Sequence, residues 1–162
     1  MPRRAASLLR QVTIMTSSHH APAGERIIES MIALARCSTS QRIIVAGSQS
    51  VEIMHEMKRR GFEHVAASAN CGKAAGQYDV ALVDWRRRTP KDLESMLDWL
   101  VGFLGPEGAV VVWMDPQKAL IRQNLCSMLE CRGFVVGETA IHDYGSAVSG
   151  KRYVAKPLPK AA

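Results

Sequence analysis

Hydrophobic positions divide the chain into segments of two kinds. Short, almost continuous apolar runs are typical of strands buried on both faces of a parallel sheet; they occur at 42–47, 64–68, 78–85 and 109–114. Between these runs, apolar residues recur every three or four positions. This spacing predicts amphipathic helices within 24–37, 50–60, 89–104 and 115–132.

Polar and conformationally special residues mark the ends of these segments. Thr89 followed by Pro90 is a helix start signal, and Ser48 or Ser50 can cap the preceding helix. Gly133 predicts the end of the last helix.

The final part of the chain has a different pattern. Two strands are expected at 134–143 and 151–157, joined by a glycine- and serine-bearing loop at 144–150. That loop is too short for a helical crossover, so the two strands should be antiparallel neighbours.

Strands that alternate with helices predict an α/β protein of three layers, α/β/α. The sheet should be mostly parallel and should close with the C-terminal antiparallel hairpin. The 162 residues suffice for one domain, which we place at 24–157. We expect flexible tails at 1–23 and 158–162, dispensable for folding.

Basic residues are concentrated at the two ends of the chain. Residues 1–24 contribute +3 and residues 151–162 contribute +4 to a net charge of +6. The body between them is therefore at −1, since +6 less +7 leaves −1. Nucleic-acid binding is not indicated for such a body, and no apolar run reaches the roughly 20 residues of a membrane span.

The cysteines fit neither a zinc site nor a disulfide framework; they are Cys37, Cys71, Cys126 and Cys131. We therefore expect no metal, reduced thiols and a cytoplasmic location. The acid-free N-terminal segment also resembles a mitochondrial presequence in composition, so the mitochondrial matrix is the alternative if the source is eukaryotic.

This order of elements resembles the class I S-adenosylmethionine-dependent methyltransferase fold. The resemblance covers about residues 25–157 and is carried by "RIIVAGSQSVEIM", "YDVALVDW", "LGPEGAVVVWM", "RGFVVGETAIHD" and "GKRYVAKP". In particular, the "GPEG" turn before an apolar strand is similar to the family's fifth strand, and the last two segments are similar to its terminal hairpin. The resemblance implies the strand order 2-1-4-5-7-6 in the family's labels, with the third strand lost because residues 69–77 are too few to form it.

The resemblance also implies where S-adenosylmethionine would bind. Gly47 and Ser48 occupy the turn that approaches the cofactor in the family, and Asn70 stands where an acid usually holds the ribose hydroxyls. Asp84 and Trp85 end the next strand, at the edge where such sheets bind ligands. We take these residues as cofactor-binding candidates and identify no catalytic residue, because "DWRRRTP" is not an Asn-Pro-Pro-aromatic motif.

Each candidate also has a structural interpretation. Asp84 could pair with Arg86 or Arg87, and the basic run 86–88 could be a solvated loop or could bind a phosphate or an acidic partner. Trp85 and Trp113 both end strands, so both could face the crevice, either to stack on a base or to fill the space. The segment 142–144 is expected to be a partly exposed loop cluster.

Three functional hypotheses follow. The turn "AGSQS" holds only one glycine, Gly47, where the family's turn is glycine-rich. This difference favours a non-catalytic binding or regulatory module, with S-adenosylmethionine as the only cofactor suggested. The first alternative is an active small S-adenosylmethionine-dependent methyltransferase. The second is a degenerate receiver-like signalling domain, because "YDVALVDW" resembles a phosphoacceptor strand; that hypothesis requires five parallel strands closed by a helix.

We also expect a protein partner, most simply a second copy of the chain. Loss of the third strand exposes the edge of the strand at 64–68, and the first helix would lack a partner if the sheet has shrunk. Two-fold dimers are the most frequent solution to such surfaces.

Overall fold

The computed structural model describes residues 23–68, 76–116 and 119–153. Asn70, Cys71 and almost all of the two predicted tails lie outside these ranges. The elements in chain order are α1 (Ala23–Ala35), β1 (Ile43–Gly47), α2 (Ser50–Arg59), β2 (Val65–Ala67), β3 (Tyr78–Asp84), α3 (Pro90–Phe103), β4 (Leu104–Met114), α4 (Ala119–Glu130), β5 (Phe134–His142) and β6 (Gly145–Arg152).

The six strands form one sheet in the order β2-β1-β3-β4-β6-β5. Strands β1 to β4 are parallel, and β6 runs antiparallel to both β4 and β5. The predicted order 2-1-4-5-7-6 is confirmed, since β3 to β6 take the places of the family's strands 4, 5, 6 and 7. The described sheet has four parallel strands and an antiparallel hairpin, and not five parallel strands closed by a helix. The receiver alternative therefore does not fit the fold.

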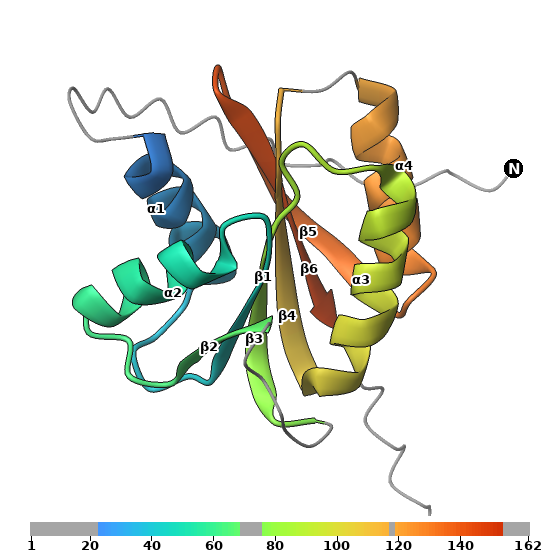
Figure 1. Ribbon diagram of the computed structural model, residues 1–162. Helices are drawn as coiled ribbons and strands as arrows, with labels where there is room; N and C mark the ends of the chain where they lie inside the picture. Colours follow the sequence, from blue (N-terminus) through green and yellow to red (C-terminus); the bar gives the residue numbers. More distant parts are fainter. Residues whose placement is uncertain (1–22, 69–75, 117–118, 154–162) are drawn as a thin grey trace, which may run out of the picture.

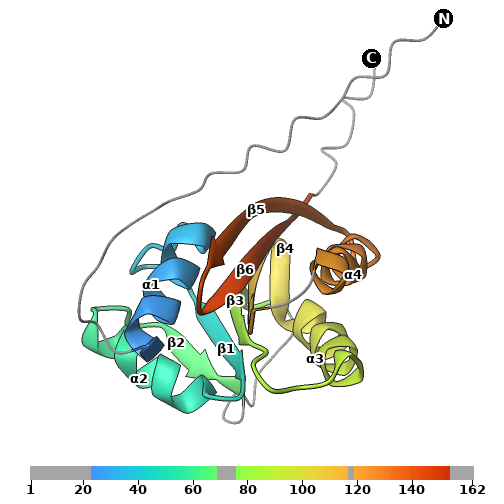
Figure 2. The ribbon, with the colours of Figure 1, turned by 90° about the horizontal axis from the view of Figure 1, so that it is seen from above.

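Helices cover both faces of the sheet, as expected for three layers. Helices α1 and α2 pack on one face and α3 and α4 on the other (Figures 1 and 2). The side chains of β3, which point alternately to the two faces of the sheet, show how an apolar run produces these layers. Val80 and Leu82 join the core under α1 and α2, while Ala81 and Val83 join the core under α3 and α4. The apolar runs thus belong to strands buried on both faces.

Helix α1 has a partner within the chain, which corrects one expectation. Its residues Ile27, Ile28 and Met31 are buried in the core cluster that includes Val111 and Trp113 of β4. The helix therefore does not offer a free apolar face for dimerisation.

The predicted loop at 144–150 is wrong, because this segment forms most of β6. Its small residues resemble a turn in sequence, but the strand needs them. A Cβ atom on Gly150 would lie 3.1 Å from Cβ of Phe134, and one on Gly145 would lie 2.6 Å from the indole of Trp113. Bulky neighbours on β4 and β5 thus select small residues in β6, and the hairpin turn shrinks to residues 143 and 144.

Smaller differences concern element ends. The predicted "GPEG" turn stays within β4 as an irregularity, since Leu104 pairs with Tyr78 and Ala109 pairs with Val80. Helix α4 begins at Ala119 rather than at 115. Neither predicted serine caps α2, whose N-cap residue Gln49 makes no side-chain cap hydrogen bond.

The start signal of α3 is confirmed as a capping box. The Thr89 hydroxyl accepts from the Asp92 backbone N–H at 3.2 Å, and the Asp92 carboxylate accepts from the Thr89 backbone N–H at 3.1 Å. These bonds satisfy two backbone donors that the helix itself leaves unpaired.

We predict that Thr89→Ala lowers the free energy of unfolding by about 1 kcal/mol, because the cap acceptor is lost. Ser95→Ala in the same helix is the control, since its hydroxyl only donates to the Lys91 carbonyl within the helix. The effect of this control should stay within about 0.5 kcal/mol. Urea unfolding of the two variants measures both values. Equal effects would contradict the cap assignment.

Candidate functional site

The carboxyl ends of the four parallel strands meet at one edge of the sheet, which we call the carboxyl edge. Gly47 of β1, Asp84 of β3 and Trp113 of β4 lie there in register with one another. The β5–β6 turn lies at the same edge, because Met114 at the end of β4 pairs with Ser146. Sheets of this kind bind ligands in the crevice at this edge.

Gly47 is required by the fold itself. Its φ of +106° disfavours any residue with a side chain, because only glycine adopts such values freely. A Cβ atom there would overlap the Asp84 carbonyl, at 2.7 Å from the carbonyl carbon. The glycine therefore allows the turn after β1 to lie directly against the end of β3. This close approach is made to the protein's own backbone.

Ser48 links the same two loops through its backbone and its side chain. Its N–H donates to the Asp84 carbonyl at 3.0 Å, and its hydroxyl donates to the Arg86 carbonyl at 2.8 Å. The Arg88 guanidinium in turn donates to the Ser48 hydroxyl oxygen at 3.2 Å. The turn after β1 is thus tied to the loop after β3.

Asp84 is fully buried and forms a two-bond ion pair with Arg86. Both of its carboxylate oxygens accept from the guanidinium, each at 2.7 Å. The hydrogen bonds with Asp84 raise the pKa of Arg86 above its ordinary value, although partial burial opposes this rise. A further contact, from the Arg86 guanidinium to the Gln49 side-chain oxygen at 2.9 Å, extends the network to the start of α2.

This arrangement decides between the two predicted partners of Asp84. Arg87 is exposed and its backbone N–H donates to Asp115 instead. Because the Asp84 carboxylate is already desolvated and paired, a ligand could use it only by displacing Arg86. Breaking a buried pair of this kind costs several kcal/mol.

Trp85 does not face the same side of the sheet as Trp113. Trp85 belongs to the core under α3 and α4, and its indole N–H donates to the Thr89 carbonyl at 3.0 Å. Trp113 lies on the opposite face, fully buried under α1. The expectation that both tryptophans face one crevice is therefore wrong. Trp113 is in register with Asp84, and Trp85 is one position further along, where the side chain points to the other face.

The hollows among the described residues include three that differ in position and size. The one at the carboxyl edge lies between α1 and α2 and measures about 210 Å³; Glu25, Glu52, Glu56, Gln49 and Arg86 are among the residues that line it. Pockets that enclose ligands of cofactor size usually measure roughly 300–1,000 Å³. This hollow is thus smaller than that range, its charged lining is mainly acidic, and none of the described cofactor-binding candidates is among the residues that line it.

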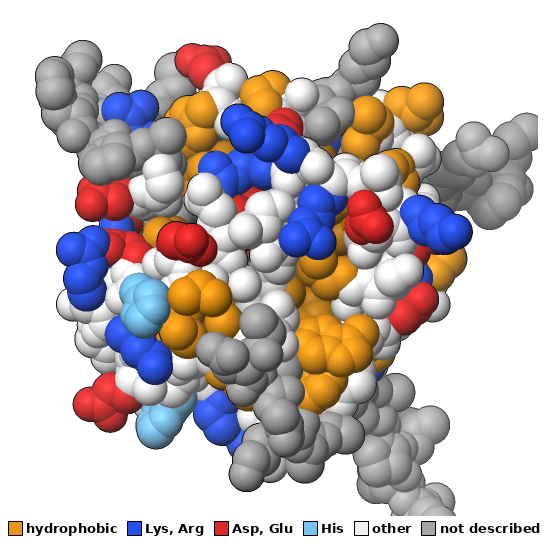
Figure 3. Space-filling view, in the orientation of Figure 1, with side chains coloured by type: hydrophobic (Ala, Val, Ile, Leu, Met, Phe, Trp, Pro, Cys, Tyr) orange, Lys and Arg blue, Asp and Glu red, His pale blue; other side chains and the backbone are white. Residues whose placement is uncertain are grey.

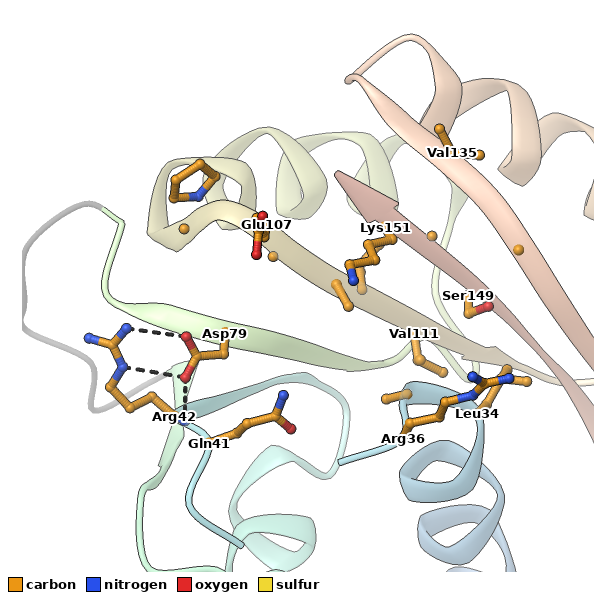
Figure 4. Close-up of a pocket in the computed structure, with 18 of the residues that line it drawn as sticks. Leu34, Arg36, Gln41, Arg42, Asp79, Glu107, Val111, Val135, Ser149 and Lys151 are labelled. Atoms are coloured by element: carbon orange, nitrogen blue, oxygen red, sulfur yellow. Dashed lines mark hydrogen bonds and ion pairs between the residues drawn. The ribbon is translucent and has the colours of Figure 1, made fainter. Parts of the chain in front are cut away.

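The largest of these three hollows lies at the opposite end of the sheet and measures about 1040 Å³. Figure 4 shows residues that line it, with the Arg42–Asp79 pair at one end. Hydrogen bonds from Arg42 lower the pKa of Asp79, and the Arg42 backbone N–H also donates to this carboxylate at 2.8 Å. Asp79 therefore ties the start of β1 to the start of β3.

Sequence reasoning missed Gln49 and also the contact that Arg88, a member of the basic run, makes with Ser48. Their partners, Arg86 and Ser48, lie about forty positions away along the chain, and no local pattern marks such a contact. The basic run itself is divided: Arg86 is half-buried and paired, whereas Arg87 and Arg88 are exposed. Figure 3 shows basic side chains gathered on one part of the surface, with acidic side chains beside them.

The segment 142–144 is partly exposed, as predicted, but His142 belongs to β5 and the segment's two rings pack together. The rings of His142 and Tyr144 stack on each other and on Trp113, with centroid distances between 4.9 and 5.9 Å. Of the three residues only Asp143 is exposed. Within the described ranges, no cluster of three or more His, Cys, Asp or Glu side chains could hold a metal, and no helix is long and apolar enough to cross a membrane.

Comparisons by sequence give no relative: no family model and no curated protein matches the chain. Comparison of folds, by contrast, finds similar solved structures. The structure is similar to a 1,6-didemethyltoxoflavin-N1-methyltransferase from Burkholderia thailandensis, solved with S-adenosylhomocysteine, at a TM-score of 0.57 and 11% identity over 79% of each chain.

Two further solved structures have the same fold. Precorrin-6y C5,15-methyltransferase from Geobacter metallireducens matches at a TM-score of 0.56 and 9% identity, over 85% of this chain and 94% of that one. An S-adenosylmethionine-dependent O-methyltransferase from Thermotoga maritima matches at a TM-score of 0.55 and 11% identity, over 89% of this chain and 70% of that one. The chain therefore has the class I methyltransferase fold, as its sequence pattern predicts.

We predict that Gly47→Ala lowers the free energy of unfolding by about 3 kcal/mol, because it combines backbone strain with overlap against Asp84. Gly102→Ala in α3 is the matched control, since a Cβ atom there meets nothing within 4 Å. That change should instead stabilise the protein by about 0.5 to 1 kcal/mol through helix propensity. Denaturant unfolding without any ligand decides, and a neutral Gly47→Ala would contradict the structural role.

Proposed function

We propose that this chain is a methyltransferase-fold domain that does not catalyse methyl transfer and acts as a binding or regulatory module. The observation that carries the proposal is the Asp84–Arg86 pair, together with the Ser48 bridge beside it. Groups that could face a cofactor at the carboxyl edge are bonded to one another. A ligand would have to break a buried ion pair before it gained any contact of its own.

Loop chemistry supports the same proposal. The turn "AGSQS" has side chains at both positions that flank Gly47, and "DWRRRTP" after β3 lacks the Asn-Pro-Pro-aromatic motif. Asn70 and the rest of 69–75 lie outside the described residues, so the contribution of Asn70 stays a prediction.

An active S-adenosylmethionine-dependent methyltransferase is the second candidate. The acidic lining of the hollow at the carboxyl edge favours it, since S-adenosylmethionine carries a net positive charge and Glu52 and Glu56 line that space. If the cofactor binds there, Glu52→Gln should weaken cofactor binding, whereas Glu130→Gln on α4, at the other face of the sheet, should not.

Calorimetry of the purified protein with S-adenosylmethionine and with S-adenosylhomocysteine tests the proposal. We expect no saturable binding in the micromolar range to either compound, because Arg86 already satisfies Asp84. An active methyltransferase of the same fold, titrated in parallel, controls for the quality of the ligands. Micromolar binding to either compound would overturn the proposal and favour the enzyme.

We further propose that the chain forms a homodimer in the cytoplasm. Strand β2 is an edge strand of three residues that pairs only with β1 among the described strands. The described cysteines are free thiols, which fits a reducing compartment. Light scattering at micromolar concentration should give twice the mass of the chain. A monomer mass would remove the dimer from the proposal without affecting its other part.

A further inference from the structure

A separate pocket of about 300 Å³ lies between α1 and the β5–β6 hairpin. Figure 2 shows α1 beside the hairpin of β5 and β6. Arg26, Ser30 and Leu34 of α1 line one side of the pocket, and Ala140, His142 and Tyr144 line the other. None of these residues belongs to the network around Asp84.

The hairpin side of this pocket is a fixed aromatic wall. The His142 and Tyr144 rings lie 4.9 Å apart at an interplanar angle of 19°. Both stack on Trp113, which is fully buried, at 5.9 and 5.6 Å. Because the buried indole packs against both rings, the aromatic side of the pocket is formed before any ligand arrives.

A hydrogen-bond chain fixes the orientation of the His142 ring. The Ser30 hydroxyl donates to the Arg26 carbonyl at 2.9 Å, so its oxygen accepts from His142 Nε2, which lies 3.2 Å away. The hydroxyl proton is thus directed at the helix backbone and away from the imidazole. This pair positions a ring and does not form an activated nucleophile, which would need the opposite direction of donation.

Among the described residues around the pocket, one cation has no ion-pair partner. Glu138 pairs with Arg36 at 2.9 Å, and Glu29 lies 3.5 Å from Arg60. For Arg26 no ion pair is found within the described residues, and its Nε is buried without any hydrogen-bond partner there. Buried donors of this kind are rare in folded proteins and usually have an acceptor.

We propose that this pocket binds a small aromatic monocarboxylate. The carboxylate would accept from Arg26, the pairing that a guanidinium forms best, and the aromatic ring would lie against His142 and Tyr144. A single unpaired cation matches one negative charge rather than a phosphate dianion. The pocket measures about 300 Å³. This volume is at the low end of the usual range for ligand pockets, and it admits one ring or two fused rings. The proposal does not depend on whether the carboxyl edge binds S-adenosylmethionine.

Titration with benzoate, followed by NMR of ¹⁵N-labelled full-length protein, tests this proposal. We expect saturable shifts of the Trp113 indole N–H and of backbone signals in α1 and in 140–144. Benzamide has the same shape without the charge, so its affinity should be lower by about tenfold or more. The absence of saturable shifts with benzoate, or equal binding of the two compounds, would overturn the proposal.

Two variants test the location and the charge separately. Arg26→Met should reduce benzoate affinity by about tenfold or more, while Arg122→Met, which removes one positive charge from α4 on the other face, should leave it unchanged. Ala33→Phe, at an exposed position that lines the same pocket, should block binding while all charges remain. Unchanged binding in Arg26→Met or in Ala33→Phe would show that benzoate binds elsewhere; if Arg26→Met fails to fold, Ala33→Phe decides alone.

Discussion

The close contact between the turn after β1 and the end of β3 controls the arrangement of the whole carboxyl edge. Gly47 lies against the Asp84 carbonyl, and the next N–H, from Ser48, donates to that same oxygen. The Asp84 side chain is buried beside this contact, where water cannot solvate it, so a cation must accompany it. Arg86 supplies that cation from only two positions away, and its guanidinium also reaches Gln49. One backbone contact thus leads to a complete internal network at the position where sheets of this kind bind their ligands.

The rest of the scaffold tolerates the short connection between β2 and β3. The central strands β1, β3 and β4 are covered by helices on both faces, and most of the largest buried side chains belong to these strands or to the helices above them. A third strand would have been added outside β2, at the edge of the sheet. Its loss therefore removes little of the core. The small size of this loss explains why the chain has the same fold as two structural neighbours to which it is only 11% and 9% identical in sequence.

Patterns along the sequence predict the parts of this fold that local chemistry determines. The buried strands, the order of the sheet and the Thr89 cap all follow from runs, spacings and start signals. Strand β6 could not be predicted in the same way, because its glycines are selected by Phe134 and Trp113, which lie across the sheet. At the site, the pairing of Asp84 with a nearby arginine was foreseeable. The bridges from Ser48 and Gln49 to the loop after β3 depend on how closely two distant turns approach each other, which no local pattern encodes.

Trp113 divides the carboxyl edge into two compartments with different properties. On the side of β1 and β3, polar loops bond to each other and leave a hollow of about 210 Å³. On the hairpin side, the indole supports the rings of His142 and Tyr144, and Gly145 leaves room for that packing because it has no side chain. Helix α1 borders both compartments, but Arg26, whose Nε has no hydrogen-bond partner among the described residues, lines only the pocket on the hairpin side. A sheet of this type needs an opening near its carboxyl edge to bind a small molecule. Among the described residues, the compartment that combines an unsatisfied buried donor with an aromatic wall is the one beside the hairpin, on the far side of Trp113 from the glycine turn.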